Sequence, residues 1–287
     1  MNNQPNTDAD VLLLDISDGI GTVTLNRPSA RNALSRALSS RLRSAMAELD
    51  QHDNVSVIVL TGTDPAFCAG VDLKELGHDG GTLKNFHPGD NVAVRGPWAP
   101  TDKPVIGAIN GVAVTGGFEL ALQCDFLIAS ERAAFGDTHA RVGVMPGWGL
   151  SVLLPQAIGF RRALEMSLTG NFIDAQEAHR LGLVNHVVAH DQLMSTARSL
   201  ASDISSVNQR SMRTYLQSYR TIHTMSVGDG LLHEALVNRD YLATFTPAEF
   251  ETRRTSIVER GRSQPGGANR VDGPDRSVRQ TDAPPTG

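Results

Sequence analysis

Two glycine-rich segments hold the residues that could do chemistry, and one of them also holds a carboxylate. The apolar run Val105–Ile109 predicts a buried strand, which leads through Thr115-Gly116-Gly117 into a helix. Backbone amides at such a turn point toward whatever lies at the helix N-terminus, which makes a site for a negatively charged oxygen. Glu119 comes three residues after Gly116, in the first turn of an otherwise apolar helix. The simplest interpretation is an oxyanion hole beside one base, although sterics and the helix dipole alone also favour these residue types.

The second segment, Ala66–Leu73, supplies the matching chemistry. Small residues at Cys68, Ala69 and Gly70 would let a ligand approach the backbone closely. The amide of Val71 would then open a short helix. Two glycine-rich turns of this kind predict two converging N–H donors for one oxygen atom.

These segments, together with a third, closely resemble the enoyl-CoA hydratase/isomerase (crotonase) family. The motifs that carry the resemblance are Ala66–Leu73, Ala108–Ala121 and Val142–Gly147, and the resemblance extends from about Val11 to about Arg260. Strands that alternate with helices already predict an α/β protein, and periodicity alone would suggest a doubly wound sheet. The resemblance implies instead a crotonase-type spiral of ββα units with a helical C-terminal region.

The resemblance also implies roles for individual residues. The amides of Val71 and Gly116 would form the oxyanion hole for an acyl-CoA thioester carbonyl, and Glu119 would be the acid/base. The residues expected at the edge that binds coenzyme A are Ala69, Gly70, Val71, Asp72, Leu73, Lys74 and Gly116. Coenzyme A is part of the substrate in such an enzyme, and we expect neither a prosthetic group nor a metal.

One position departs from the pattern of the family's hydratases. They carry a second catalytic glutamate four residues after the phenylalanine that is Phe135 here, and this chain has His139 there. A neutral His139 could hold water or accept its proton, whereas a cationic one beside Glu119 would weaken the carboxylate as a base. Two other interpretations are that His139 only fills the pocket wall, or that Asp137 is the substitute carboxylate.

The expected activity follows from these residues. Removal of a thioester α-proton requires stabilisation of the enolate oxygen, which preorganised amides provide. We expect an enoyl-CoA hydratase-like enzyme that works through such an enolate, with Glu119 as acid/base. The alternatives are an enoyl-CoA isomerase with one-base chemistry, because a single carboxylate can move a proton between two carbons, and a catalytically silent acyl-CoA-binding protein.

Composition limits the cellular setting and the partners. A net charge of -5 argues against a nucleic-acid partner. No window approaches the roughly 20 apolar residues of a membrane helix, and the first ten residues lack the features of a signal peptide. The two cysteines, Cys68 and Cys124, lie in apolar or glycine-rich settings, which fits a reducing compartment. Cytoplasm is therefore the expected location.

The hydrophobic pattern predicts an α/β core at 1–190, a helical region at 191–262 and a disordered tail at 263–287. The resemblance implies that the core holds the CoA site and the oxyanion hole and that the helical region serves trimerisation. The resemblance implies a homotrimer or a hexamer built from two trimers. Besides the strand at 105–109, periodicity predicts strands at 11–16, 20–25, 55–60, 126–129 and 183–188. It predicts helices at 36–50, 117–123, 149–158, 161–168, 174–181, 192–202, 207–224, 228–242 and 247–260.

Overall fold

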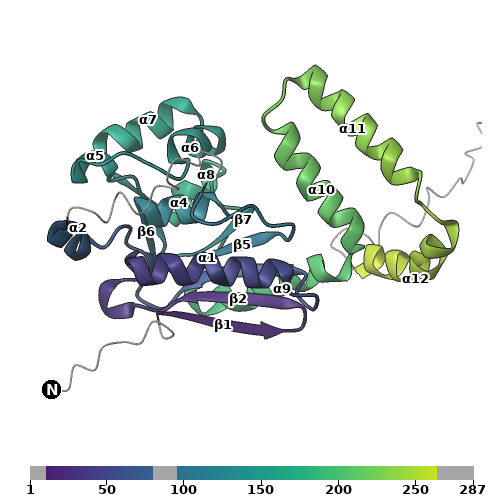
Figure 1. Ribbon diagram of the computed structural model, residues 1–287, viewed down its shortest axis with the longest axis horizontal. Helices are drawn as coiled ribbons and strands as arrows, with labels where there is room; N and C mark the ends of the chain where they lie inside the picture. Colours follow the sequence, from purple (N-terminus) through teal and green to yellow (C-terminus); the bar gives the residue numbers. More distant parts are fainter. Residues whose placement is uncertain (1–10, 80–95, 264–287) are drawn as a thin grey trace, which may run out of the picture. The chain divides into compact units, whose positions relative to one another are not determined.

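The computed structural model describes residues 11–79 and 96–263 (Figure 1). The predicted tail therefore lies outside the described residues, apart from Ser263. The chain divides into two compact units, Met1–Thr221 and Ile222–Gly287, and each is described by itself. The unit that contains the sheets thus continues past residue 190.

The first unit is built on two β-sheets. The larger sheet has the strand order β1, β2, β3, β5, β7, β10 and is parallel, except that β1 runs antiparallel to β2. Its strands are β1 Leu12–Ser17, β2 Ile20–Leu25, β3 Val57–Gly62, β5 Val105–Ile109, β7 Phe126–Ser130 and β10 His186–Val188. The smaller sheet has the order β4, β6, β8, β9, and its last pair is antiparallel. Its strands are β4 Ala66–Cys68, β6 Val112–Val114, β8 Ala134–Gly136 and β9 Phe172–Asp174.

Three times in succession, the chain forms one strand of the larger sheet and then one strand of the smaller sheet. β3 is followed by β4, β5 by β6 and β7 by β8, and each pair leads into a helix: α2 Leu73–Asp79, α4 Gly116–Leu122 and α5 His139–Val142. This is a spiral of ββα units, so the predicted fold class is confirmed. The smaller sheet was not predicted from periodicity, because strands of three residues are too short to show it.

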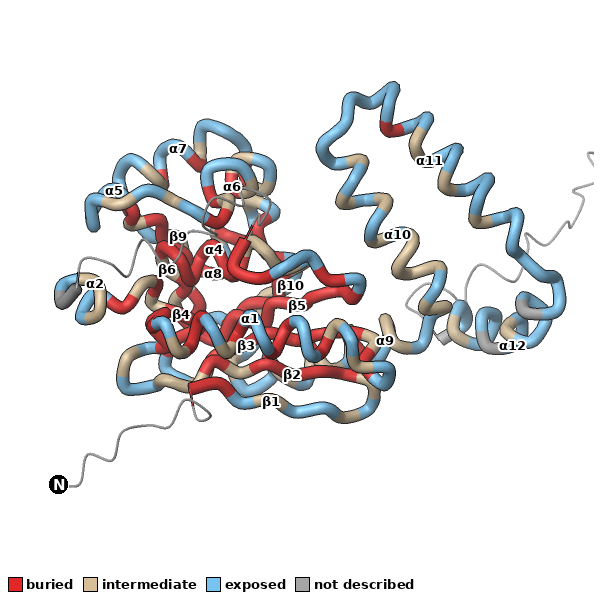
Figure 2. The backbone as a smooth tube through the Cα atoms, viewed as in Figure 1, coloured by how far each residue is buried: buried red, intermediate tan, exposed pale blue. Residues whose placement is uncertain are grey.

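Side chains on the central strands alternate between two hydrophobic layers. On β3, Val57 and Val59 face helix α9 (Leu193–Ser206), whereas Ile58 and Leu60 face the core that contains α1 (Arg36–Gln51). All four side chains are fully buried, as expected for a parallel strand covered on both faces. Figure 2 shows this burial along β2, β3 and β5, whereas β1 at the edge of the sheet is largely exposed.

Helix α1 begins and ends with defined polar contacts. The Ser35 hydroxyl accepts a hydrogen bond from the amide of Leu38 and caps its N-terminus. At the other end the buried Lys103 donates from Nζ to the carbonyl oxygens of Leu49 and His52, both at 2.6 Å. A cation is favourable there because the last carbonyls of a helix carry partial negative charge.

The other helices follow the predicted pattern with shifted ends. In the first unit they are α6 Leu150–Ile158, α7 Phe160–Thr169, α8 Ala175–Arg180 and α10 Gln209–Ile222, which reaches the boundary of the units, with short 3₁₀ turns η1 Pro28–Ala30 and η2 His190–Gln192. The strand predicted at 183–188 is shorter, because the amides of Leu183 and Val184 bond back to Ala178 and close the end of α8.

The second unit contains α11 Val227–Leu242 and α12 Pro247–Ser263, both close to the predicted ranges. Most residues of these helices are exposed in this single chain (Figure 2). Among the described residues, no helix combines the length and the apolar composition needed to cross a membrane.

Candidate functional site

The two glycine-rich turns predicted from the sequence lie against each other. A Cβ atom placed on Gly117 would lie 2.7 Å from Cys68 Cβ and closer still to the Cys68 carbonyl oxygen. A Cβ on Gly70, whose φ is +86°, would lie 2.7 Å from the carbonyl oxygen of Val114. These contacts are possible only for glycine, so the glycines bring the end of β4 onto the start of α4.

Two neighbouring backbone amides have no hydrogen-bond partner among the described residues. The amide of Leu34 donates to Gly70, and the amide of Asp72 donates to Leu34, so the N–H of Val71 faces away from that contact. Gly116 is the first residue of α4, where an amide has no partner within the helix. Among the hydrogen bonds of residues 11–79 and 96–263, none uses the amide of Val71 or Gly116.

These two residues also lie close together. A Cβ on Gly116 would be 3.9 Å from Val71 Cγ2, so the two residues are neighbours in the fold. Of the turn Thr115-Gly116-Gly117, whose amides the sequence predicts at the anion site, Thr115 does not contribute, because its N–H donates to the carbonyl oxygen of Gly136 at 3.0 Å. Instead, the Thr115 hydroxyl lies 2.6 Å from that of Thr138 and links the start of α4 to the start of α5.

Glu119 is a buried carboxylate held in one orientation. Its side chain comes from the first turn of α4, and the residue is 3% exposed. Oε1 accepts hydrogen bonds from the amides of Trp148 at 2.7 Å, Gly147 at 3.2 Å and Leu150 at 3.4 Å. These donors lie at the N-terminus of α6, where a negative charge is stabilised. Gly147 ends the motif Val142–Gly147, but a backbone amide has no side-chain signal that would predict this contact from the sequence.

The second carboxylate oxygen of Glu119 faces His139. The distance from Glu119 Oε2 to His139 Nε2 is 3.5 Å. The other ring nitrogen, Nδ1, lies 2.6 Å from Asp137 Oδ1, which also accepts the backbone N–H of His139 at 3.1 Å. All three residues are buried, so Asp137, His139 and Glu119 form one continuous polar chain within an apolar core.

The surroundings of this chain favour a charged imidazole. Burial lowers the pKa of His139, but the hydrogen bonds and charges of Asp137 and Glu119 outweigh burial and raise it to about 9. Burial raises the pKa of Asp137, but hydrogen bonds from His139 and the Ser167 hydroxyl outweigh it and hold that pKa below its usual value. At neutral pH a cationic imidazole therefore lies between two carboxylates. Of the alternatives for His139, the structure favours the cation.

The remaining residues expected at the CoA edge divide into two groups. The Asp72 carboxylate is turned inward: Oδ2 lies 2.9 Å from an Arg27 nitrogen, and Oδ1 accepts the amide of Lys74 at 3.1 Å. Asp72 thus fixes the turn from within. Leu73 and Lys74 are exposed. A small, mainly aliphatic cleft adjoins this edge, and its lining residues are Ala69, Val71, Leu73, Leu76, Thr115, Val142 and Val144.

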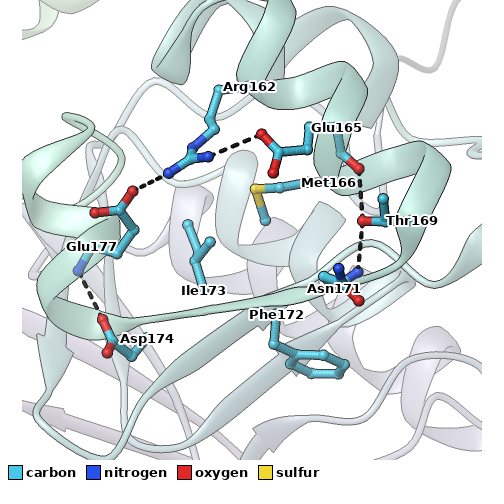
Figure 3. A pocket seen from close by; sticks show the side chains of 9 residues that line it. All are labelled: Arg162, Glu165, Met166, Thr169, Asn171, Phe172, Ile173, Asp174 and Glu177. Atoms are coloured by element: carbon cyan, nitrogen blue, oxygen red, sulfur yellow. Dashed lines mark hydrogen bonds and ion pairs between the residues drawn. The ribbon is translucent and has the colours of Figure 1, made fainter.

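A separate hollow lies among α7, β9 and α8 (Figure 3). Its charged groups pair with one another: Glu177 accepts hydrogen bonds from Arg180 and Arg162, which lower its pKa to about 2. Arg162 also binds Glu165 at 2.9 Å. None of the predicted site residues lines this hollow, so we assign the chemistry to the Glu119 site.

Comparison with known proteins agrees with this geometry. The family model described as enoyl-CoA hydratase/isomerase matches residues 15–262. A Mycobacterium leprae protein named a probable enoyl-CoA hydratase is 36% identical over 251 residues, which cover 88% of this chain and 96% of that protein. A peroxisomal protein of Arabidopsis thaliana, named a probable enoyl-CoA hydratase, is 37% identical over 258 residues, 87% of this chain and 93% of that one.

Solved structures give the same result. An enoyl-CoA hydratase from Mycobacterium tuberculosis has a TM-score of 0.69 and 49% identity, and the match covers 80% of this chain and 98% of that chain. One from Bacillus anthracis has a TM-score of 0.77 and 31% identity, with 86% and 96% covered. The chain therefore belongs to the enoyl-CoA hydratase/isomerase family.

Proposed function

We propose that this enzyme adds water to the double bond of a 2-enoyl-CoA thioester. The observation that carries the proposal is Glu119, a buried carboxylate with Oε1 fixed by three amides and Oε2 turned toward His139. A carboxylate that served only the fold would not need its second oxygen turned toward another ionisable side chain in an apolar core. This placement supports a base aimed at a reacting group.

The two free amides supply the other half of the chemistry. When hydroxide adds to the β-carbon, negative charge develops on the thioester oxygen, and the amides of Val71 and Gly116 would stabilise it there. One such donor contributes roughly 3 kcal/mol when judged by its removal. Glu119 would accept a proton from the attacking water. Every step uses groups of the chain itself, so the mechanism needs no metal and no prosthetic group.

Coenzyme A would lie along the edge formed by residues 69–74, with its acyl end in the aliphatic cleft beside Val71. Binding energy from the coenzyme would hold the reacting carbons near Glu119. We also propose that the enzyme works as a homotrimer or as a pair of trimers in the cytoplasm. Sedimentation velocity of the full chain would show the assembly, and cell fractionation would show the location.

Isomerisation of a 3-enoyl-CoA is the second candidate, because Glu119 is the one carboxylate among the predicted catalytic residues, the others being His139, Val71 and Gly116. It would need only proton transfer between two carbons of the enolate. Hydration is preferred because His139 gives the site a second group that can exchange a proton.

Proton NMR in D₂O separates these functions. Crotonyl-CoA and a 3-enoyl-CoA are incubated with wild type, with Glu119→Gln, and with Glu48→Gln as a surface control on α1. We expect a 3-hydroxyacyl product from wild type and the control, and a rate lower by about 10²–10⁴-fold for Glu119→Gln. Double-bond migration without water addition would assign isomerisation. Binding of the thioesters without any reaction would leave a silent acyl-CoA-binding protein.

A further inference from the structure

We propose that Asp137 and His139 act together as the second catalytic unit of this site, with the His139 imidazolium as the acid that protonates the substrate α-carbon and Asp137 as the residue that positions it. This inference rests on the proposed hydration. Asp137 would position the imidazole and would not act as a substitute base. The two residues would work as a pair, although the sequence presents them as alternatives.

The contacts of Asp137 support positioning rather than direct catalysis. Its Oδ1 atom receives both the backbone N–H and the ring Nδ1 of His139, at 3.1 and 2.6 Å. The Ser167 hydroxyl from α7 also bonds to this carboxylate. Asp137 is buried, and the His139 imidazole lies between it and Glu119, with Nδ1 on Asp137 Oδ1 and Nε2 toward Glu119 Oε2. The Asp137 carboxylate is therefore held by Ser167 of α7 and in turn holds the His139 ring in place.

The fixed ring leaves one nitrogen for chemistry. With Nδ1 bound to Asp137, Nε2 points to Glu119 Oε2 across 3.5 Å, longer than an ordinary hydrogen bond. Catalytic contacts of this kind often tighten only when substrate binds. His139 Nε2 and Glu119 Oε2 thus lie side by side as an acid and a base, and no other described group bonds to either atom.

Among the described residues, two charged side chains face His139. Asp137 faces it from its own segment and Glu119 faces it from α4. The nearby Arg141 guanidinium points away, to the Thr169 carbonyl oxygen and to Asn171. The group Asp137, His139 and Glu119, with two carboxylates and one imidazolium, has a net charge of one negative unit. A site with two glutamates, one ionised and one protonated, would have the same net charge.

The proton balance closes within this unit. Glu119 takes one proton from water as the oxygen forms its bond to the β-carbon, and the π electrons of the double bond move to the enolate oxygen at the amides of Val71 and Gly116. The enolate electrons then take the Nε2 proton of His139 to form the new C–H bond at the α-carbon. Protonated Glu119 finally returns its proton to Nε2. The site is restored, and one water has been added.

The test is the pH dependence of hydration in wild type, Asp137→Asn and His139→Gln, with Asp18→Asn as a control on an exposed turn. In wild type, kcat should fall as the pH rises through about 9, where His139 loses its proton. In Asp137→Asn this alkaline limb should move to lower pH by about one unit or more, so that kcat at pH 9 drops about fivefold or more while KM changes little. His139→Gln should lose the limb and most of the rate at every pH.

Imidazole NMR of the free enzymes gives a readout that does not depend on turnover: His139 should titrate at lower pH in Asp137→Asn than in wild type. The double variant Asp137→Asn/His139→Glu should regain hydration relative to His139→Gln, without the alkaline limb. An unchanged pH profile in Asp137→Asn, or an equal loss at every pH, would overturn the proposal while hydration by wild type stands. Absence of hydration by wild type would instead remove the proposed function and this inference with it.

Discussion

The contact between Gly117 and Cys68 gives a direct test of how the two turns hold their amides. In Gly117→Ala the new methyl group would lie 2.7 Å from Cys68 Cβ and closer to the Cys68 carbonyl oxygen, so the backbone of β4 or α4 must move. Replacement of glycine within a helix gains about 0.5–1 kcal/mol. Overpacking of this kind costs about 1–3 kcal/mol or more. We expect a net loss of roughly 1–2 kcal/mol in the free energy of unfolding.

Gly116→Ala is the matched control for stability. Its methyl group would first meet Leu34 Cδ1 at 3.1 Å, the far end of a side chain that can adjust. Gly77→Ala on α2 would meet no atom within 4 Å and reports the helix propensity alone. The melting temperature should therefore fall by roughly 2–8 °C for Gly117→Ala and stay near that of wild type for the two controls.

The activity of Gly117→Ala carries the functional part of the reasoning. A shift of about 1 Å at Gly117 moves the neighbouring amide of Gly116 away from that of Val71, and misplacement on this scale can cost about 100-fold in rate. Hydration is assayed at a temperature where circular dichroism shows each variant to be folded. An unchanged kcat in a destabilised Gly117→Ala would show that the contact supports the fold without placing the amides. Wild-type stability would refute the packing argument itself.

Three further predictions concern buried polar groups. The folded state raises the pKa of His139 from 6.5 to about 9. The stability that the protonated ring contributes is therefore complete below pH 6.5 and is lost as the pH rises through 9. Urea unfolding should show the free energy of unfolding falling by up to roughly 3 kcal/mol over this window in wild type, and little in His139→Gln. Lys103→Met should lower the free energy of unfolding, measured by urea denaturation, by about 1–3 kcal/mol, because the carbonyl oxygens of Leu49 and His52 lose their donor. Asn32→Ala should cost about 3 kcal/mol by the same measurement, because the Asn32 amide bonds to Arg27, Thr63 and Ala66.

Hydrophobic pattern was sufficient to predict the larger sheet but not the smaller one. A strand such as β3 shows its nature in the sequence because Val57 to Leu60 form a continuous apolar run. β4, Ala66–Cys68, is flanked by a turn and by glycine, and its three residues were interpreted only as a glycine-rich turn. It becomes a strand because β6 pairs with it, and that pairing depends on residues more than 40 positions later. Local sequence does not carry this information.

In the site, the functional residue types could be predicted from the sequence, but their hydrogen-bond partners could not. The glycines and Glu119 were predicted as an oxyanion site with a base, because their spacing places them at one strand-to-helix turn. The donors that fix Glu119 come from residues 147–150, and their amides carry no side-chain signal. Asp72 was expected to face the coenzyme, yet its carboxylate turns to Arg27, 45 positions away. Contacts of backbone amides and long-range ion pairs follow from the fold and not from the motif.

The substitution of histidine for the second glutamate makes physical sense only as part of a pair. An isolated imidazolium would not remain charged at 5% exposure, because burial alone favours the neutral ring. Asp137 lies two residues earlier, the spacing at which an aspartate side chain accepts the backbone N–H of a following residue. The same turn places the Asp137 carboxylate beside the His139 ring, so the local sequence itself supplies the counter-charge. A His139→Glu change made alone would set two carboxylates against each other, and recovery of the two-glutamate chemistry therefore requires that Asp137 change as well.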